Sequence, residues 1–326
     1  MPKFPFELPC DASDEVVRVC NEMWDVGYAK IGCILNFEEA RSLRELINPM
    51  MKECRPWTDR WTKFDSNEYF LPPFGDNDQI MLSNIAARDA RLDELLEKIL
   101  TNETLKESLS IILGNGYKAW ELSARRSNAT DQGLRMHEDA VGEFGISVLL
   151  NNQTDAYGTT SLMPRSHRSR VSCRDAGVED YLRPSIMKLF SHPITGSAGD
   201  VFFFFKKTWH GRVQSKRMIP SDCLLFGLFP TGYRFKPFQI PLAEMQKLPN
   251  ELRRLLRIDE GFNIEDDGYF RVVGDNSDKR MIDLIYQKQY AVNSIWDMGP
   301  LIKPTLDNFR SLYKKLRSGE RRSSPK

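Results

Sequence analysis

The feature that most restricts the fold is a series of short apolar segments between residues 117 and 229, each bounded by turn-forming residues. The segments expected to be strands are 117–123, 133–139, 144–151, 158–163, 186–191, 200–205 and 223–229. Short strands at this spacing are typical of an antiparallel sandwich or jelly roll. The segment Val201–Phe205 is apolar at every position, so we expect this strand to be covered on both faces.

Helical patterns flank this β-rich region on both sides. Ser13 can cap a helix with an apolar face, and the sequence Asn36–Glu39 predicts a capping box that opens another helix after a short strand at 28–35. Further helices are expected at 82–113 in two pieces and, beyond residue 233, at 242–258, 281–290 and 306–316. We therefore expect a mainly β fold with flanking helices, divided into an N-terminal helical and lid region 1–114, a β core 115–235, a C-terminal helical extension 236–317 and a disordered basic tail 318–326.

The charge balance limits the classes of partner. The chain has 46 Lys and Arg residues against 45 Asp and Glu residues, so no overall charge attracts nucleic acid or an acidic membrane surface. No apolar run approaches the roughly 20 residues of a membrane span, and residues 1–10 have no apolar stretch of signal-peptide length. Six scattered cysteines without a C-x-x-C motif are typical of a reducing compartment. These patterns predict a cytoplasmic protein without nucleic-acid or membrane partners, and they leave open whether it is a monomer or a homodimer.

One short pattern has the residue types of a metal site. In His137-Glu138-Asp139, the first and third side chains would point to the same face of a strand. His210 follows the apolar strand 200–205 and could meet them where strand ends converge. Two imidazoles and one carboxylate form the facial triad of non-heme Fe(II) oxygenases, which leaves positions open for O2 and a bidentate cosubstrate. The alternative is an ordinary, partly buried His–Asp pair.

Four segments in the same order make the interpretation more specific. Trp24–Ile31 followed by Leu35–Glu39, then Met136–Asp139, Gly158–His167 and Ala198–Gly211, resemble motifs of the phytanoyl-CoA dioxygenase-like family. The resemblance extends over roughly residues 14–230 and does not include the chain beyond about residue 240.

This resemblance implies a double-stranded β-helix, a cupin-like jelly roll, that uses Fe(II), 2-oxoglutarate and O2. It implies that His137, Asp139 and His210 bind iron, and that a small or medium-sized metabolite is hydroxylated while 2-oxoglutarate is converted to succinate and CO2. Related halogenases have a small residue where this chain has Asp139, so hydroxylation is favoured, with desaturation and ring formation left open. The alternative functions are a cupin-type metal-dependent isomerase and a non-catalytic ligand-binding jelly roll.

The sequence departs from the family at the expected 2-oxoglutarate residue. The family usually has an arginine about eleven residues after the distal histidine, where this chain has Ser221. The candidates to replace it are Arg212, two residues after His210, then Arg217, and more distantly Arg126 with its neighbour Arg125. Each could instead be a surface arginine.

Two other features carry weaker expectations. The Pro-rich segment 56–78 predicts a long loop that either contacts substrate or packs on the barrel. His167 is expected to support a turn or a hydrogen bond rather than to bind metal, and Trp209 is expected to point into the core.

Overall fold

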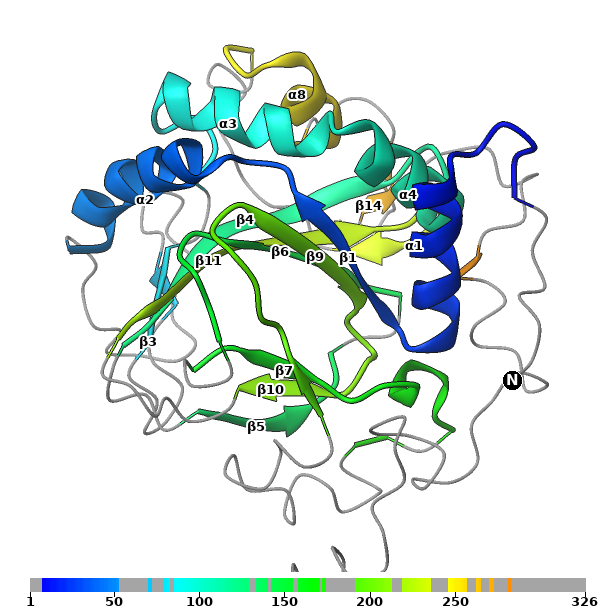
Figure 1. The fold of residues 1–326 in the computed structure, drawn as a ribbon. Helices are drawn as coiled ribbons and strands as arrows, with labels where there is room; N and C mark the ends of the chain where they lie inside the picture. The colour runs from blue at the N-terminus through cyan, green and yellow to red at the C-terminus, as the bar shows by residue number, and fades with distance from the viewer. Residues whose placement is uncertain are drawn as a thin grey trace, which may run out of the picture.

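The structure is a computed structural model, and it contains two facing sheets with helices on one side (Figure 1). The structure describes residues 8–52, 70–71, 79–82, 85–128, 133–139, 142–154, 158–170, 172–173, 191–212, 219–235, 246–256, 262–264, 270–272 and 281–282. No helix within these ranges is long and apolar enough to cross a membrane.

All strand pairs in the sheets are antiparallel. The seven-stranded major sheet has the order β1 (Tyr28–Cys33), β9 (Asp200–Phe205), β6 (Phe144–Leu149), β11 (Ser221–Phe229), β4 (Lys118–Ser127), β3 (Gln79–Leu82) and β2 (Phe70–Leu71). The minor sheet has the order β5 (Leu134–His137), β10 (His210–Arg212), β7 (Thr160–Leu162) and β8 (His192–Pro193). A separate small sheet contains β12 (Arg234–Phe235), β14 (Phe270–Val272) and β13 (Phe262–Ile264).

The helices lie on the face of the major sheet that points away from the minor sheet (Figure 1). They are α1 (Asp14–Asp25), α2 (Phe37–Lys52), α3 (Ala90–Leu100), α4 (Glu103–Leu113) and α8 (Asn250–Leu256), and a 3-10 helix η1 spans Ser166–Arg168. Two predicted helix starts are confirmed. The Ser13 hydroxyl accepts a bond from the Val16 N–H, and Asn36 and Glu39 exchange the two hydrogen bonds of a capping box.

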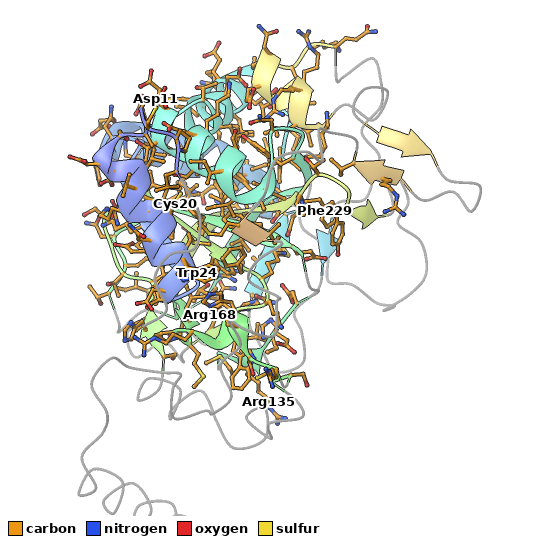
Figure 2. The ribbon with its side chains drawn as sticks, turned by 90° about the vertical axis from the view of Figure 1, so that its right-hand side faces the viewer. Asp11, Cys20, Trp24, Arg135, Arg168 and Phe229 are labelled. Atoms are coloured by element: carbon orange, nitrogen blue, oxygen red, sulfur yellow. The ribbon has the colours of Figure 1, made fainter. Side chains whose placement is uncertain are left out.

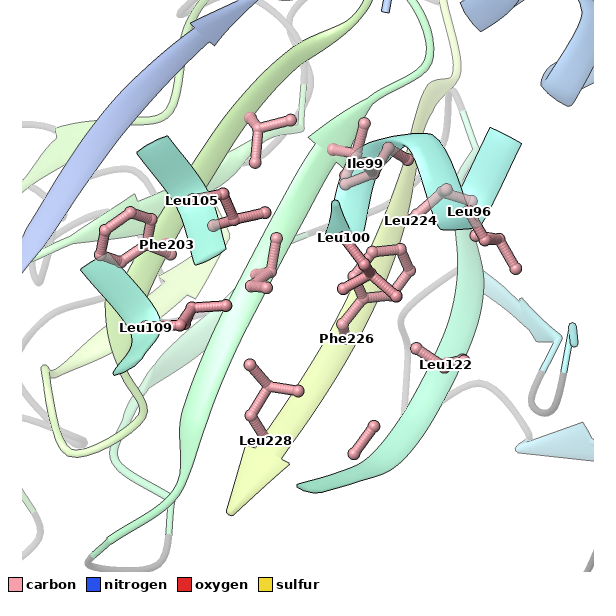
Figure 3. Packing of buried hydrophobic residues seen from close by; sticks show 14 of the residues in the cluster. Leu96, Ile99, Leu100, Leu105, Leu109, Leu122, Phe203, Leu224, Phe226 and Leu228 are labelled. Atoms are coloured by element: carbon pink, nitrogen blue, oxygen red, sulfur yellow. The ribbon is translucent and has the colours of Figure 1, made fainter. Parts of the chain in front are cut away.

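The main core lies between these helices and the major sheet. Alternate residues of each strand point into it, among them Phe203 of β9 and Leu224, Phe226 and Leu228 of β11. Leucines of α3 and α4 pack on them from above, as Figure 3 shows. Because strand side chains alternate between faces, the intervening residues of the same strands point to the space between the two sheets.

The strand β9 has the predicted covering on both faces. All six residues from Asp200 to Phe205 are buried. Phe203 belongs to the core under the helices, whereas Phe202 and Phe204 form a second cluster with Leu162 of β7 between the sheets. The apolar run therefore reflects a strand that packs against two layers.

Several predicted boundaries are wrong. Residues 79–82 form β3 instead of opening a helix at residue 82, and β4 extends to Ser127 instead of ending at 123. The helix expected at 242–258 is described only as α8, over Asn250–Leu256. Most of the segments predicted at 56–78, 186–191 and 281–290, and all of 306–316 and the tail 318–326, lie outside the described residues.

A close junction joins α1, β1 and η1. Gly27 has a φ of +91° and lies against the fully buried His167 ring, which bonds the Trp24 carbonyl through Nε2 at 3.1 Å. The guanidinium of Arg168 lies 5.5 Å from the centre of the Trp24 ring, and Figure 2 shows these two residues next to each other. His167 thus has the predicted hydrogen-bonding role.

Candidate metal centre

The three residues of the predicted triad come together at one end of the minor sheet. His137 ends β5, His210 begins β10, and the two are directly paired across these antiparallel strands with ring centres 4.3 Å apart. Asp139 follows β5 by two residues, and its backbone N–H is fixed by the Lys206 carbonyl at 3.0 Å. One ligand atom from each residue lies within 4.8 Å of the others.

The way His210 reaches the site differs from the prediction. The expected position was the end of the strand that contains the phenylalanine run. Instead β9 ends at Phe205, and residues 206–209 carry the chain from the major to the minor sheet before His210 opens β10. Trp209, at the end of this crossing, is fully buried as predicted.

Backbone carbonyls fix the orientation of both imidazoles. His137 Nδ1 lies 2.9 Å from the Arg135 carbonyl and His210 Nδ1 lies 2.7 Å from the Thr208 carbonyl. A carbonyl only accepts, so each Nδ1 donates to it, and Nε2 is the nitrogen of each ring that is left to face the other ligands. These Nε2 atoms point toward Asp139, at 3.8 Å from Oδ1 for His137 and 3.5 Å from Oδ2 for His210. Carbonyl bonds of this kind are typical second-shell contacts of metal-binding histidines.

The electrostatic environment favours the ligand forms of two of these groups. Burial, with the neighbouring His210 adding to it, lowers the pKa of His137 to about 4, so its imidazole is neutral at neutral pH. Burial alone would raise the pKa of Asp139. The hydrogen bond from His210 and the positive charge of Lys206 outweigh burial and hold that pKa below its usual range. A neutral imidazole and an ionised carboxylate are the forms that bind a divalent cation.

A largely buried lysine connects the triad to two further carboxylates. Lys206 Nζ lies 3.7 Å from Asp139 Oδ2, 3.4 Å from Glu121 Oε2 and 3.7 Å from Glu143 Oε2. Its ammonium therefore lies among acidic groups from β4, from the residue before β6 and from the segment after β5. Sequence reasoning did not single out this network, because its members are far apart in the chain.

The three candidate cosubstrate arginines have different positions. Arg212 is fully buried between the sheets and donates to Gln79 Oε1 of β3 at 2.5 Å. The structure does not bring Arg126 to the triad: it lies on the helix side of β4, where it pairs with Asp222 at 2.7 Å and bonds Asn48 of α2. Arg217 lies outside the described residues.

The neighbouring Arg125, and not Arg126, has the inward position that a cosubstrate arginine needs. Arg125 points between the sheets, is 9% exposed and donates to Thr160 Oγ1 of β7 at 3.0 Å. The sequence contained a signal for this orientation, since Leu122 and Ala124 alternate with Ser123 and Arg125. Because the strand was expected to end at residue 123, that alternation was not extended to Arg125.

The two remaining histidines lie outside the triad. His167 packs under α1, and His192 Nδ1 lies 2.6 Å from the Tyr28 hydroxyl oxygen. The triad therefore uses the pair of histidines that the sequence pattern selected. Its two imidazole nitrogens and one carboxylate are a donor set that fits non-heme Fe(II).

Comparisons with known proteins were informative at the level of fold. No family model matches the chain, and no curated protein matches it by sequence. Among solved structures, EctD from S. alaskensis in its apo form matches 69% of this chain and 80% of its own, with 16% identity and a TM-score of 0.52.

Two other solved structures match with TM-scores of 0.49. HygX from Streptomyces hygroscopicus, with nickel and 2-oxoglutarate bound, is 13% identical over 68% of this chain and 88% of its own. The non-heme alpha ketoglutarate dependent epimerase SnoN from nogalamycin biosynthesis is 14% identical over 72% of this chain and 90% of its own. Together with the sheet topology, the match to EctD establishes the fold as a jelly-roll β core with flanking helices.

Proposed function

We propose that this protein is an Fe(II)/2-oxoglutarate-dependent dioxygenase that hydroxylates a small or medium-sized metabolite. The observation that carries the proposal is the convergence of His137, Asp139 and His210, with one ligand atom from each within 4.8 Å of the others. The motifs that resemble the phytanoyl-CoA dioxygenase-like family support the same reaction class.

The residues of the site suit the metal that the reaction needs. His137 and His210 would hold Fe(II) through Nε2, since each Nδ1 is committed to a backbone carbonyl, and Asp139 would supply a carboxylate oxygen. At such a centre, Fe(II), 2-oxoglutarate and O2 supply an oxidation in which 2-oxoglutarate yields succinate and CO2, one oxygen atom of O2 enters succinate and the other enters a substrate C–H bond.

The third ligand favours hydroxylation within this class. Asp139 keeps a carboxylate where halogenases of the resembling family have a small residue that admits halide. Lys206 and the backbone bond from Asp139 N–H to the Lys206 carbonyl hold this carboxylate beside the two imidazoles. Because Asp139 supplies this carboxylate, the site lacks the vacancy that a small residue would leave for halide.

The test has two measurements on the purified protein. The first is Fe(II) binding under anaerobic conditions, by calorimetry. The second is succinate release after O2 is admitted, with and without added 2-oxoglutarate. We expect Fe(II) binding and succinate release that needs both 2-oxoglutarate and Fe(II). His210→Ala should abolish both, whereas His192→Gln, which alters a histidine outside the triad, should retain them.

The same measurements separate the alternative functions. A metal-dependent isomerase or a ligand-binding jelly roll would bind the metal without consuming 2-oxoglutarate. Failure of the anaerobic protein to bind Fe(II) at all would overturn the proposal.

A further inference from the structure

We propose that Arg125 of β4 binds the distal carboxylate of 2-oxoglutarate, in place of the arginine that the resembling family has on the strand after the distal histidine. The inference rests on the proposed function and assigns the second end of its cosubstrate.

Arg125 occupies the space between the two sheets. Its neighbours Leu122 and Ala124 face the helices, so the alternation of β4 turns Arg125 inward, where it crosses to Thr160 on the opposite sheet. It is nine-tenths buried, and its Nε–H makes no hydrogen bond with the described residues. A buried guanidinium with an unused donor is a site prepared for an acceptor.

Arg125 lies on the strand next to the one where the family arginine was expected. β11 is the strand on which that arginine was expected, and its Cys223 is directly paired with Arg125. Ser221, at the expected position itself, is paired with Ser127 of β4. From its position on β4 opposite Cys223, the side chain of Arg125 can therefore reach the space between the sheets that an arginine on β11 would reach.

Two hydroxyls beside Arg125 also lack partners. The Ser127 and Ser221 side chains are buried, and neither Oγ forms a hydrogen bond with the described residues. Both alternate with residues that face the helices, Arg126 and Asp222, so both point inward with Arg125. Three unused polar groups, from two adjacent strands, thus gather on one patch of the interior. A polar ligand could form hydrogen bonds with all three groups.

The charge of this patch selects an anion. Arg212 enters the same space from the minor sheet, and its Cα is directly paired with that of Thr160, the residue that Arg125 contacts. Arg125 donates to the neutral hydroxyl of Thr160, and Arg212 donates to the neutral amide oxygen of Gln79. A carboxylate suits this place because a guanidinium offers it two parallel N–H donors. Thr160, which accepts from Arg125, still has its own O–H to donate.

The patch and the triad border the same space between the two sheets. His210 and Arg212 are two residues apart on β10, so their side chains point the same way with Cα atoms about 7 Å apart. A dicarboxylate can therefore meet the metal at one end and the arginine patch at the other.

The experiment compares two 2-oxo acids by calorimetry on the Mn(II)-loaded protein without O2. The probes are 2-oxoglutarate and 2-oxobutyrate, which has the same metal-binding end and no distal carboxylate. We expect the wild type to prefer 2-oxoglutarate by about 10- to 100-fold, the size of one hydrogen-bonded charged contact. Arg125→Gln should bind both acids equally weakly while its affinity for Mn(II) stays that of the wild type.

The matched control is Arg126→Gln, the same change at the adjacent residue on the opposite face, which should keep the preference. If Arg125→Gln does not fold, Arg125→Lys keeps the charge without the two-pronged geometry and should reduce the preference. A preference that persists in a folded Arg125 variant overturns the inference. A wild type that binds Mn(II) but neither acid would instead overturn the proposed function.

Discussion

At the scale of single residues, the metal centre depends on three side chains whose donor atoms are fixed by the backbone. The carbonyls of Arg135 and Thr208 accept hydrogen bonds from Nδ1 of His137 and of His210, and the Lys206 carbonyl accepts one from the N–H of Asp139. Because these backbone contacts fix the donor atoms, little reorganisation should accompany metal binding. Its affinity should therefore depend on the ligands themselves.

Removal of one of these ligands should weaken metal binding. Changes in second-shell partners typically cost about 10- to 100-fold in metal affinity, so His137→Ala or Asp139→Ala should cost more than that. Calorimetric titration with Mn(II) measures the loss. His192→Gln should bind Mn(II) like the wild type, and a His137→Ala protein of unchanged affinity would show that the metal binds elsewhere.

The buried His167 predicts a pH dependence of stability. Burial, with the charge of Arg168 adding to it, lowers the pKa of His167 well below its ordinary value of 6.5. Below about pH 6.5 the unfolded chain therefore binds a proton that the folded chain does not, and the free energy of unfolding falls as pH falls, by up to about 1.4 kcal/mol per pH unit.

His167→Gln tests this assignment, since glutamine can still donate to the Trp24 carbonyl but does not titrate. Denaturant unfolding between pH 5 and pH 8 should give a shallower slope below about pH 6.5 for the variant than for the wild type. Parallel curves for the two proteins would mean that other groups carry the dependence.

At the scale of elements, the link from α1 to β1 depends on the absence of a side chain at Gly27. A Cβ there would lie 2.4 Å from His167 Nδ1 and 2.7 Å from Thr208 Oγ1, and the φ of +91° is itself unfavourable for other residues. Gly27→Ala should thus lower the free energy of unfolding by more than the roughly 1–2 kcal/mol of the backbone conformation.

Gly32→Ala is the matched control, because Gly32 has a φ of +112° and no atom within 4 Å of the added Cβ. It should show the backbone cost alone in denaturant unfolding. Equal losses in the two variants would mean that the contact with His167 relaxes without cost.

The contact between α2 and the major sheet predicts a second effect. Asp222 of β11 is 2% exposed at its side chain and pairs with Arg126 of β4 at 2.7 Å and with Arg44 of α2 at 2.5 Å. Asp222→Asn leaves the guanidinium of Arg126 without its counter-charge, and breaking a buried pair costs about 3–5 kcal/mol. Denaturant unfolding measures this loss. The exposed pair of Glu38 with Arg41 is the comparison, and Glu38→Gln should lower the free energy of unfolding by at most about 1 kcal/mol in the same measurement.

At the scale of the whole molecule, the sequence predicted the jelly roll and the triad because both have local signals. The apolar alternation of the strands and the pattern His137-Glu138-Asp139 are readable from adjacent residues. The inward turn of Arg125 was missed because β4 was expected to end at residue 123, and the acidic surroundings of Lys206 were missed because they come from segments that are distant in sequence. Arg165 is a further case, because its φ of +70°, in a region that usually favours glycine, is revealed only by the folded turn.

The two proposals together predict how ligands stabilise the whole fold. The metal would bind His137 of β5, Asp139 just after β5 and His210 of β10 in the minor sheet, whereas Arg125 belongs to β4 of the major sheet. A 2-oxo dicarboxylate held at both ends therefore connects the two sheets, and its binding should depend on the metal.

Thermal unfolding should show this dependence as an increase in Tm. With Mn(II) present, 2-oxoglutarate at 100 times its Kd should stabilise the folded state by about 2.7 kcal/mol. The same concentration without metal should raise Tm far less, because only the arginine end of the ligand is then held. Arg125→Gln should lose the increase caused by 2-oxoglutarate and keep the increase caused by Mn(II). An equal effect of 2-oxoglutarate with and without Mn(II) would place its binding away from the triad, and the sheets would then not be connected through the metal.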